Sequence, residues 1–485
     1  MMPVLTLSSE PQSSSRDSPR KSWASPFETR LRRRRCVLRM LGVAMLFTVL
    51  VYGTYAGIHH PKIYPKIKNT ELMQMIIGPK PLPPLYHDFR KSERRLPQHF
   101  TKPFASGEKY LWVASHSCCS GWGNVMQDLI LTAHLTHASG RGFVFDDYEW
   151  VRGGPAYSEW NGKVIPAHIP LSAIISGPLV GGKWDVTDQT PLSISKEHFE
   201  KICPNPYILH GERVRVAHGD GASAQKVIET WINFIAEIED PCVEVPADSG
   251  PIFHPYSFGN KDEILPVWPT LSTSPVLTHF GWSSLAHRAT ETNQALLGPI
   301  SSHAHSTTEH PYSRIDGLLV IHIRRGDFLE HCENLGHWGA AFLAFNRFPE
   351  FLDPWEPPQG DDAQKLAIYL RRCVPTIPQI VDKVTQVQQT NTAQGLKKVY
   401  IMTNGDPAWL KQLKDALKGA YAWDSIATSR DMILTLREKY VSHTVDMLIG
   451  QRAQVFIGNG FSSVSSNVAM LRQANGFPLE STRML

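Results

Sequence analysis

A short apolar run that ends in charged residues constrains this chain most. Residues 317–323 read Gly-Leu-Leu-Val-Ile-His-Ile and lead directly into Arg-Arg-Gly-Asp at 324–327. An apolar, β-branched run of this length before a glycine is typical of a buried strand of an α/β sheet that breaks into a loop. Ligands of open α/β sheets gather at the carboxyl ends of the strands, so we expect His322, Arg324 and Asp327 at a binding edge.

The adjacent arginines point to an anion. Side chains alternate along a strand, so His322 and Arg324 are predicted on one face and Arg325 on the other. A planar guanidinium meets oxyanions bidentately, which suits a phosphate or pyrophosphate. Two other interpretations are surface arginines paired with nearby acids and an adhesion tripeptide at residues 325–327. The position at the mouth of a predicted core strand favours the anion site.

The composition is that of a folded chain without a nucleic-acid-binding face. The length of 485 residues exceeds one core, so two lobes are expected. Hydrophobic residues make up 42% and charged residues 19%, which argues against global disorder. The net charge of +4 comes largely from an arginine cluster at 30–35. The remainder is near neutral, so no nucleic-acid partner is predicted.

The N-terminal part reads as a membrane anchor on a stem. Residues 1–39 form a predicted disordered, basic, cytosolic tail. Residues 40–58 carry no charge and, at about 1.5 Å per residue, span roughly 28 Å as a helix. Arginines on the N-terminal flank predict a single-pass type II membrane protein of the secretory pathway (Golgi or ER), with its body in the lumen. The alternative is a cleaved signal peptide. The proline-rich residues 59–108 are predicted to be an extended stem.

The cysteines and histidines do not predict a metal site. No CxxC pair occurs among the seven cysteines. In an oxidising lumen, the six after Cys36 could form up to three disulfides, with the pairing left open. Cys36 itself reads as an unmodified thiol, with palmitoylation as the alternative. His134 and His137 are three residues apart on a predicted helix, but no third ligand is spaced with them, so we interpret them as ordinary helix residues.

Residues 109–310 are predicted to form an N-terminal α/β lobe. A strand at 110–114, a turn at 120–128, a helix at 129–138 and a strand at 142–145 make one β-turn-α-β unit. Gly121 and Gly123 are not a dinucleotide fingerprint, because Met126 occupies the third glycine position. They suit either close backbone approach to a ligand at a helix start or a tight turn without a ligand.

Residues 311–485 are predicted to form a C-terminal, donor-binding lobe. After the opening strand come a loop-rich insert at 333–360 and a helix at 368–387. Strands are expected at 398–402 and 454–457, and helices at 408–417, 440–450 and 468–473. This order predicts a doubly wound parallel sheet. The Gly- and Ser-rich residues 458–467 form a second predicted oxyanion cradle, and with Arg324 they would make a pyrophosphate site without metal ligands.

Three motifs resemble one family. His322-Ile-Arg324-Arg325-Gly-Asp327 resembles the first peptide motif of the GDP-fucose fucosyltransferase superfamily, which holds the α1,6- and protein O-fucosyltransferases. Residues 455–465 resemble its C-terminal motif, with Asp446 at the acidic position of the preceding helix, and residues 121–124 resemble the glycine–asparagine turn of the protein O-fucosyltransferases. The motifs lie in the family's order and look most like its fungal branch.

The resemblance implies a GT-B-like fold of two Rossmann-type lobes with the donor, GDP-fucose, in the cleft. It implies no metal, no cofactor and inversion at the anomeric carbon. Arg324 would be catalytic, because it would hold the β-phosphate and stabilise the charge that grows as the fucose–phosphate bond breaks. The donor-binding residues implied are His322, Arg325, Asp327, Gly123, Asn124, Asp446, Ser462, Ser463, Val464 and Ser465.

Some positions depart from the family pattern. Val464 stands where an aromatic residue is common, and Val125 follows Asn124 where glutamine is frequent. The first lobe shows no clear catalytic base; Asp128 is a candidate, although its place also suits a capping or solvated acid. We expect transfer of L-fucose to a hydroxyl of a protein or glycan. The alternatives are a catalytically silent GT-B-like nucleotide- or glycan-binding protein and a transferase of another nucleotide sugar.

Overall fold

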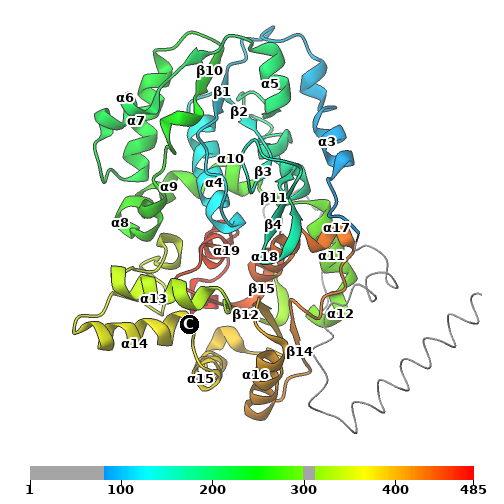
Figure 1. The fold of residues 1–485 in the computed structure, drawn as a ribbon, viewed down its shortest axis with the longest axis vertical. Helices are drawn as coiled ribbons and strands as arrows, with labels where there is room; N and C mark the ends of the chain where they lie inside the picture. Colours follow the sequence, from blue (N-terminus) through cyan, green and yellow to red (C-terminus); the bar gives the residue numbers. More distant parts are fainter. Residues whose placement is uncertain (1–80, 299–311) are drawn as a thin grey trace, which may run out of the picture. The chain divides into compact units, whose positions relative to one another are not determined.

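The structure is a computed structural model that describes residues 81–298 and 312–485 (Figure 1). The predicted tail at 1–39 and anchor at 40–58 lie outside the described residues. Among the helices of the described ranges, none combines the length and apolar character that crossing a bilayer needs.

The first lobe is built on a five-stranded parallel sheet in the order β8-β2-β1-β10-β9. Predicted strands at 110–114 and 142–145 are confirmed as β1 and β2, which neighbour each other. The strands are β1 (Tyr110–Val113), β2 (Gly142–Phe145), β8 (Ile194–Ser195), β9 (Tyr207–Ile208) and β10 (Cys242–Val245). The helices around it are α4 (Trp122–Ala138), α5 (Lys196–Ile202), α6 (Gly211–His218) and α7 (Ala224–Ala236).

Short strands and helices lie among the longer elements between residues 148 and 297. Three antiparallel pairs are β3 (Tyr148–Glu149) with β6 (His168–Ile169), β4 (Tyr157–Trp160) with β5 (Lys163–Pro166), and β7 (Ile175–Ser176) with β11 (Gly281–Trp282). Short helices follow: α8 (Lys261–Ile264), α9 (Trp268–Leu271), α10 (Pro275–Thr278), α11 (Ser284–Thr292) and α12 (Gln294–Leu297). Asn293, between the last two, exchanges hydrogen bonds of 2.8 and 2.9 Å with the backbone of Ile433, so this segment lies on the second lobe rather than the first.

The second lobe has a five-stranded parallel sheet in the order β14-β13-β12-β15-β16, which confirms the predicted mixed α/β fold with parallel sheets. Its strands are β12 (Ile315–Ile323), β13 (Lys398–Thr403), β14 (Ser425–Thr428), β15 (Ala453–Gly458) and β16 (Thr482–Met484). Its helices are α13 (Phe328–Trp338), α14 (Asp362–Cys373), α15 (Ile377–Gln388), α16 (Pro407–Ala420), α17 (Leu436–Lys439), α18 (Ser442–Arg452) and α19 (Ser463–Ala474).

Strand alternation divides β12 between two cores. Leu319, Ile321 and Ile323 belong to the apolar cluster that contains residues of α15 and α16. Leu318 and Val320 belong to the larger cluster, which contains residues of α18 and α19. The central strand is therefore covered on both faces, as a parallel sheet requires.

Two predicted helical boundaries are wrong. The helix predicted at 368–387 is two helices, α14 and α15, because Pro375 cannot continue the first; Thr376 then caps α15 in a capping box with Gln379. The predicted Ser-rich turn is half helical, since α19 already begins at Ser463. The insert at 333–360 also begins in a helix, α13.

The C-terminal part of the predicted stem is folded rather than extended. Residues 87–100 contain α3 (His87–Glu93) and a 3₁₀ turn, Pro97–Phe100. Tyr86 is buried, and its hydroxyl donates to the Arg437 carbonyl at 2.7 Å. The Glu93 carboxylate accepts from the backbone and hydroxyl of Ser172 at 3.0 and 2.6 Å. These contacts attach α3 to both lobes.

The two lobes meet where α4 and α19 begin (Figure 1). A Cβ placed on Gly123 would lie 2.6 Å from Ser463 Oγ and 2.9 Å from Val464 N. The side-chain amide of Asn467 donates to the Gly123 carbonyl at 2.7 Å. Glycine is therefore required at 123 by close packing between the lobes.

Six cysteines pair within the described residues. The disulfides are Cys118–Cys119, Cys203–Cys242 and Cys332–Cys373. The adjacent cysteines Cys118 and Cys119 bond to each other.

Gly123→Ala tests the contact between the lobes. We expect it to lower the free energy of unfolding by about 1–3 kcal/mol, because the added methyl group meets backbone as well as a side chain. Gly121→Ala is the matched control, since a Cβ at 121 meets nothing within 4 Å. Denaturant unfolding of both variants measures the difference; equal stability of the two would contradict the packing.

Replacing Cys332 and Cys373 with alanine tests a long-range disulfide. The bond closes a sequence separation of 41 residues, so the chain-entropy model predicts a loss of about 4 kcal/mol. Removing the Cys118–Cys119 bond, whose separation is 1, frees almost no chain entropy and serves as the comparison. If thermal unfolding shows the two double variants equally destabilised, the entropic account fails.

Candidate functional site

Arg324 follows β12 directly and is held at the sheet edge. Its Nη2 donates to Asp327 Oδ2 at 3.0 Å, and its guanidinium lies 5.1 Å from the ring centre of Phe328. The side chain is 31% exposed, so the guanidinium is oriented and still accessible. A cation in this state can receive an anion with little loss of side-chain entropy.

His322 connects the end of β12 to the start of α19. It is buried, and its Nδ1 lies 2.7 Å from Ser465 Oγ. The same hydroxyl oxygen accepts from the backbone N–H of Asn459 at 2.9 Å. Burial, followed by the charge of Arg324, lowers the pKa of His322 to about 3. The neutral imidazole therefore acts as a structural link between the two cradles.

The loops that carry both cradles leave the sheet side by side. Strands β12 and β15 are parallel neighbours, with Ile321 paired to Ile457. Arg324 shares the strand face of His322, which contacts α19. The predicted meeting of the arginine loop and the Ser-rich segment at one edge agrees with this geometry.

The first turns of two helices, α4 and α19, are in contact beside this edge. The Ser-rich segment supplies Ser462 and the first turn of α19, and Gly123 in the first turn of α4 packs against it. Ser463 and Val464 are half-buried, whereas the side chain of Asn124 is exposed. A helix N-terminus carries about half a positive charge, so this place favours an anion.

Arg325 lies on the opposite face, as alternation predicts. Its guanidinium stacks 4.4 Å from the Trp409 ring centre and donates to the carbonyls of 374–375 at 3.3 Å. The Asn404 side chain bridges the Arg325 backbone at 2.8 and 2.9 Å and Asp327 Oδ1 at 2.9 Å. These contacts brace the loop that carries Arg324.

Asp446 on α18 is bound inside the lobe. Its carboxylate accepts from the Tyr400 hydroxyl at 2.6 Å and from the Ser429 hydroxyl at 3.0 Å on both oxygens. Burial raises the pKa of Asp446 to about 6. A ligand contact here would share oxygens that are already hydrogen-bonded.

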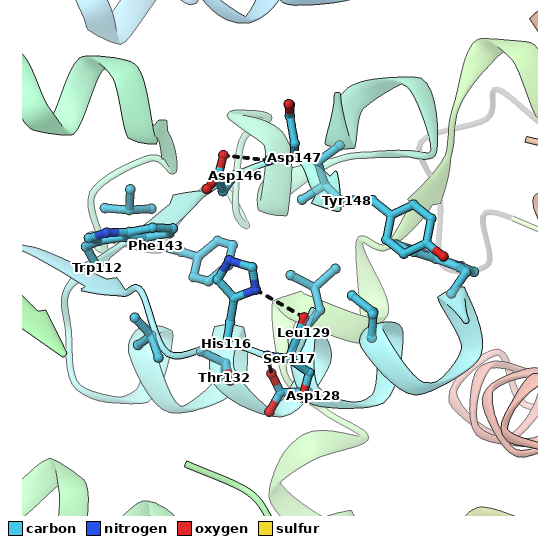
Figure 2. A pocket seen from close by; sticks show the side chains of 15 residues that line it. Trp112, His116, Ser117, Asp128, Leu129, Thr132, Phe143, Asp146, Asp147 and Tyr148 are labelled. Atoms are coloured by element: carbon cyan, nitrogen blue, oxygen red, sulfur yellow. Dashed lines mark hydrogen bonds between the residues drawn. The ribbon is translucent and has the colours of Figure 1, made fainter. Parts of the chain in front are cut away.

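Sequence reasoning missed a pocket at the carboxyl ends of β1 and β2 (Figure 2). His116 and Asp146 follow these neighbouring strands, the same signal that singled out Arg324. Asp128 lines the pocket and is neither a cap nor solvated: it is buried, and Oδ2 accepts from the Ser117 backbone at 2.7 Å. Burial raises the pKa of Asp128 to about 6.

The described residues contain no group of three His, Cys, Asp or Glu side chains that could hold a metal ion. His134 and His137 point to different partners. His134 Nε2 lies 3.3 Å from Thr270 Oγ1, whereas His137 pairs with Asp188 at 2.6 Å.

Three solved fucosyltransferase structures are similar at low identity. POFUT1 without ligand is 14% identical, with 79% of this chain and 99% of that chain covered and a TM-score of 0.46. NodZ α-1,6-fucosyltransferase soaked with GDP-fucose is 11% identical, with 75% of this chain and 92% of that chain covered and a TM-score of 0.34. A variant of Arabidopsis thaliana FUT1 in complex with GDP is 14% identical, with 86% of this chain and 81% of that chain covered and a TM-score of 0.33. Similarity at this level decides nothing about the chain, and no curated protein matches it.

The sequence match to a family is local and specific. Residues 295–475 match the family described as GDP-fucose protein O-fucosyltransferase. This segment contains β12 with Arg324, α18 with Asp446 and the start of α19. Residues 295–475 of this chain are therefore similar to the GDP-fucose protein O-fucosyltransferases.

Proposed function

We propose that the protein transfers L-fucose from GDP-fucose to a hydroxyl of a protein or glycan, with inversion, without a metal, and on a GT-B-like pair of lobes. The observation that carries this proposal is the hydrogen bond between His322 and Ser465. It joins the loop of Arg324 to the N-terminus of α19 within the segment that matches the family.

The geometry supports one division of roles. The diphosphate would lie against the N-terminus of α19, with Arg324 at the β-phosphate, where negative charge grows as the bond to fucose breaks. Gly123 and Asn124 would approach from α4. Inversion follows from a single displacement, in which the acceptor attacks from the side opposite the leaving diphosphate.

The remaining predicted donor-binding residues would position the arginine loop or contact other groups of the donor. Arg325 and Asp327 hold the arginine loop in place through Asn404. Ser462–Ser465 would offer hydroxyl and backbone N–H groups to phosphate, and Asp446 would contact guanine or ribose.

The predicted location in the secretory pathway, Golgi or ER, is part of the proposal. Three disulfides are typical of proteins that fold in an oxidising compartment, which supports a luminal body. Full-length protein should remain in the membrane pellet after alkaline carbonate washing; recovery in the supernatant would contradict the anchor at 40–58. The similarity to the fungal branch stays a prediction.

Donor selectivity separates this function from its alternatives. We expect release of GDP from GDP-fucose and not from other GDP-sugars. This release should continue with EDTA present, because the proposed site needs no metal to hold the diphosphate. Binding of GDP-fucose without GDP release would support a silent binding protein. Preference for another GDP-sugar would support a different transferase.

Arg324→Ala should lower the rate of GDP release from GDP-fucose by about 100-fold or more, because the developing charge loses its cation. Arg324→Lys should recover only part of this rate, since lysine lacks the bidentate fork. Arg314→Ala is the matched control: it removes an exposed arginine paired with Asp316 at the other end of β12. Undiminished GDP release in Arg324→Ala would refute the assigned role.

A further inference from the structure

The pocket of the first lobe combines an apolar wall with acids and one histidine (Figure 2). Aromatic rings and aliphatic side chains make most of the wall, and no arginine or lysine lines it. The polar lining comes from His116, Ser117, Asp128, Thr132, Asp146 and Asp147. Asp146 and Asp147 are paired with Lys196 and Arg90, so the lining offers a phosphate no unpaired lysine or arginine. The pocket therefore suits a neutral, hydroxyl-bearing group better than a phosphate.

His116 is held in a defined orientation. Its Nδ1 lies 3.2 Å from the Ser117 carbonyl oxygen, an acceptor, so the proton of the neutral ring belongs on Nδ1. The lone pair then belongs to Nε2, the ring nitrogen that points across the pocket toward the side of Asp146 in Figure 2. Burial lowers the pKa of His116, so the ring is neutral near pH 7.

One carboxylate near His116 favours a positive charge on its ring, and two nearby cations oppose it. Asp146, which raises the pKa of His116, follows β2 and is fixed by hydrogen bonds from Lys196 Nζ at 3.0 Å and from the Asp147 backbone at 2.8 Å. Arg152 and Lys196 lower that pKa. A histidine with a fixed tautomer and a nearby carboxylate can accept a proton and keep it briefly.

The pocket also contains polar atoms that lack partners. Within the described residues, Trp122 Nε1, Asp128 Oδ1 and Thr132 Oγ1 have no hydrogen-bond partner, and all three side chains are buried. Together they offer a donor, an acceptor and a group that can be either, as a bound hydroxyl would need. Trp122 opens α4 and immediately precedes Gly123, so the pocket adjoins the helix end assigned to the donor.

We propose that this pocket receives the hydroxyl-bearing group of the acceptor and that His116 Nε2 takes its proton; the inference rests on the proposed fucosyl transfer. The acceptor O–H bond breaks, and its proton passes to Nε2. The acceptor oxygen forms a bond to the anomeric carbon of fucose. The bond from that carbon to the phosphate oxygen breaks, and its electron pair leaves with GDP. Asp146 stabilises the His116 imidazolium until the imidazolium releases its proton to solvent.

Chemical rescue tests the proton transfer in the full-length protein, with GDP-fucose as donor and water as acceptor. We expect His116→Ala to lower GDP release by about 100-fold or more while GDP binding stays at the wild-type level. Added imidazole should restore the rate, and the restored rate should rise with pH as imidazole loses its proton. His137→Ala, which removes a histidine that lies outside the pocket and contacts Asp188, should release GDP at the wild-type rate.

The outcomes separate the two levels of the proposal. Wild-type protein that releases no GDP from GDP-fucose contradicts the proposed function itself. Wild-type activity together with an equally active His116→Ala overturns the role of His116 alone. Loss of GDP binding in His116→Ala, or failure of imidazole to restore its rate, also overturns proton transfer and indicates a structural role. Imidazole should leave Arg324→Ala inactive, because no base replaces its charge.

Discussion

The structure depends on the close approach of two helix N-termini, those of α4 and α19. Each carries a partial positive charge, so their meeting is electrostatically unfavourable until an anion lies between or beside them. Gly123 permits the approach, and the Asn467 amide fixes it through the Gly123 carbonyl at 2.7 Å. Arg324 adds a full charge at the neighbouring strand end. A diphosphate is the ligand that such an arrangement would bind most readily.

The two lobes divide the proposed chemistry by charge. The second lobe presents a guanidinium and helix N–H groups, which suit a leaving diphosphate. The pocket of the first lobe presents His116 and carboxylates, which suit a neutral hydroxyl that loses a proton. Charge separation of this kind keeps the acceptor pocket from binding the donor's phosphates. Trp122 at the start of α4 lines the pocket and precedes the glycine that contacts α19.

Sequence patterns predicted β1, β2, β12, β13 and β15 and the two faces of β12, because burial on both sides of a strand leaves an apolar run. The other five strands of the two parallel sheets were not predicted. The same patterns failed where tertiary contacts decide. Residues 86–100 looked like stem, yet Tyr86 and Glu93 find partners more than 70 residues away. The start of α19 was not predicted, because its serines are typical of a turn. In the structure, the hydrogen bond from Asn467 to the Gly123 carbonyl stabilises this end of the helix. His116 was overlooked although it follows a predicted strand, because it belongs to no motif.

A crystal structure with bound GDP is the direct test of this diphosphate site. We expect the β-phosphate within hydrogen-bonding distance of the Arg324 guanidinium and of backbone N–H groups in the first turn of α19. We also expect the Gly123 end of α4 to face the diphosphate. GDP bound elsewhere, with Arg324 and the start of α19 left in solvent, would show that these groups do not form the donor site.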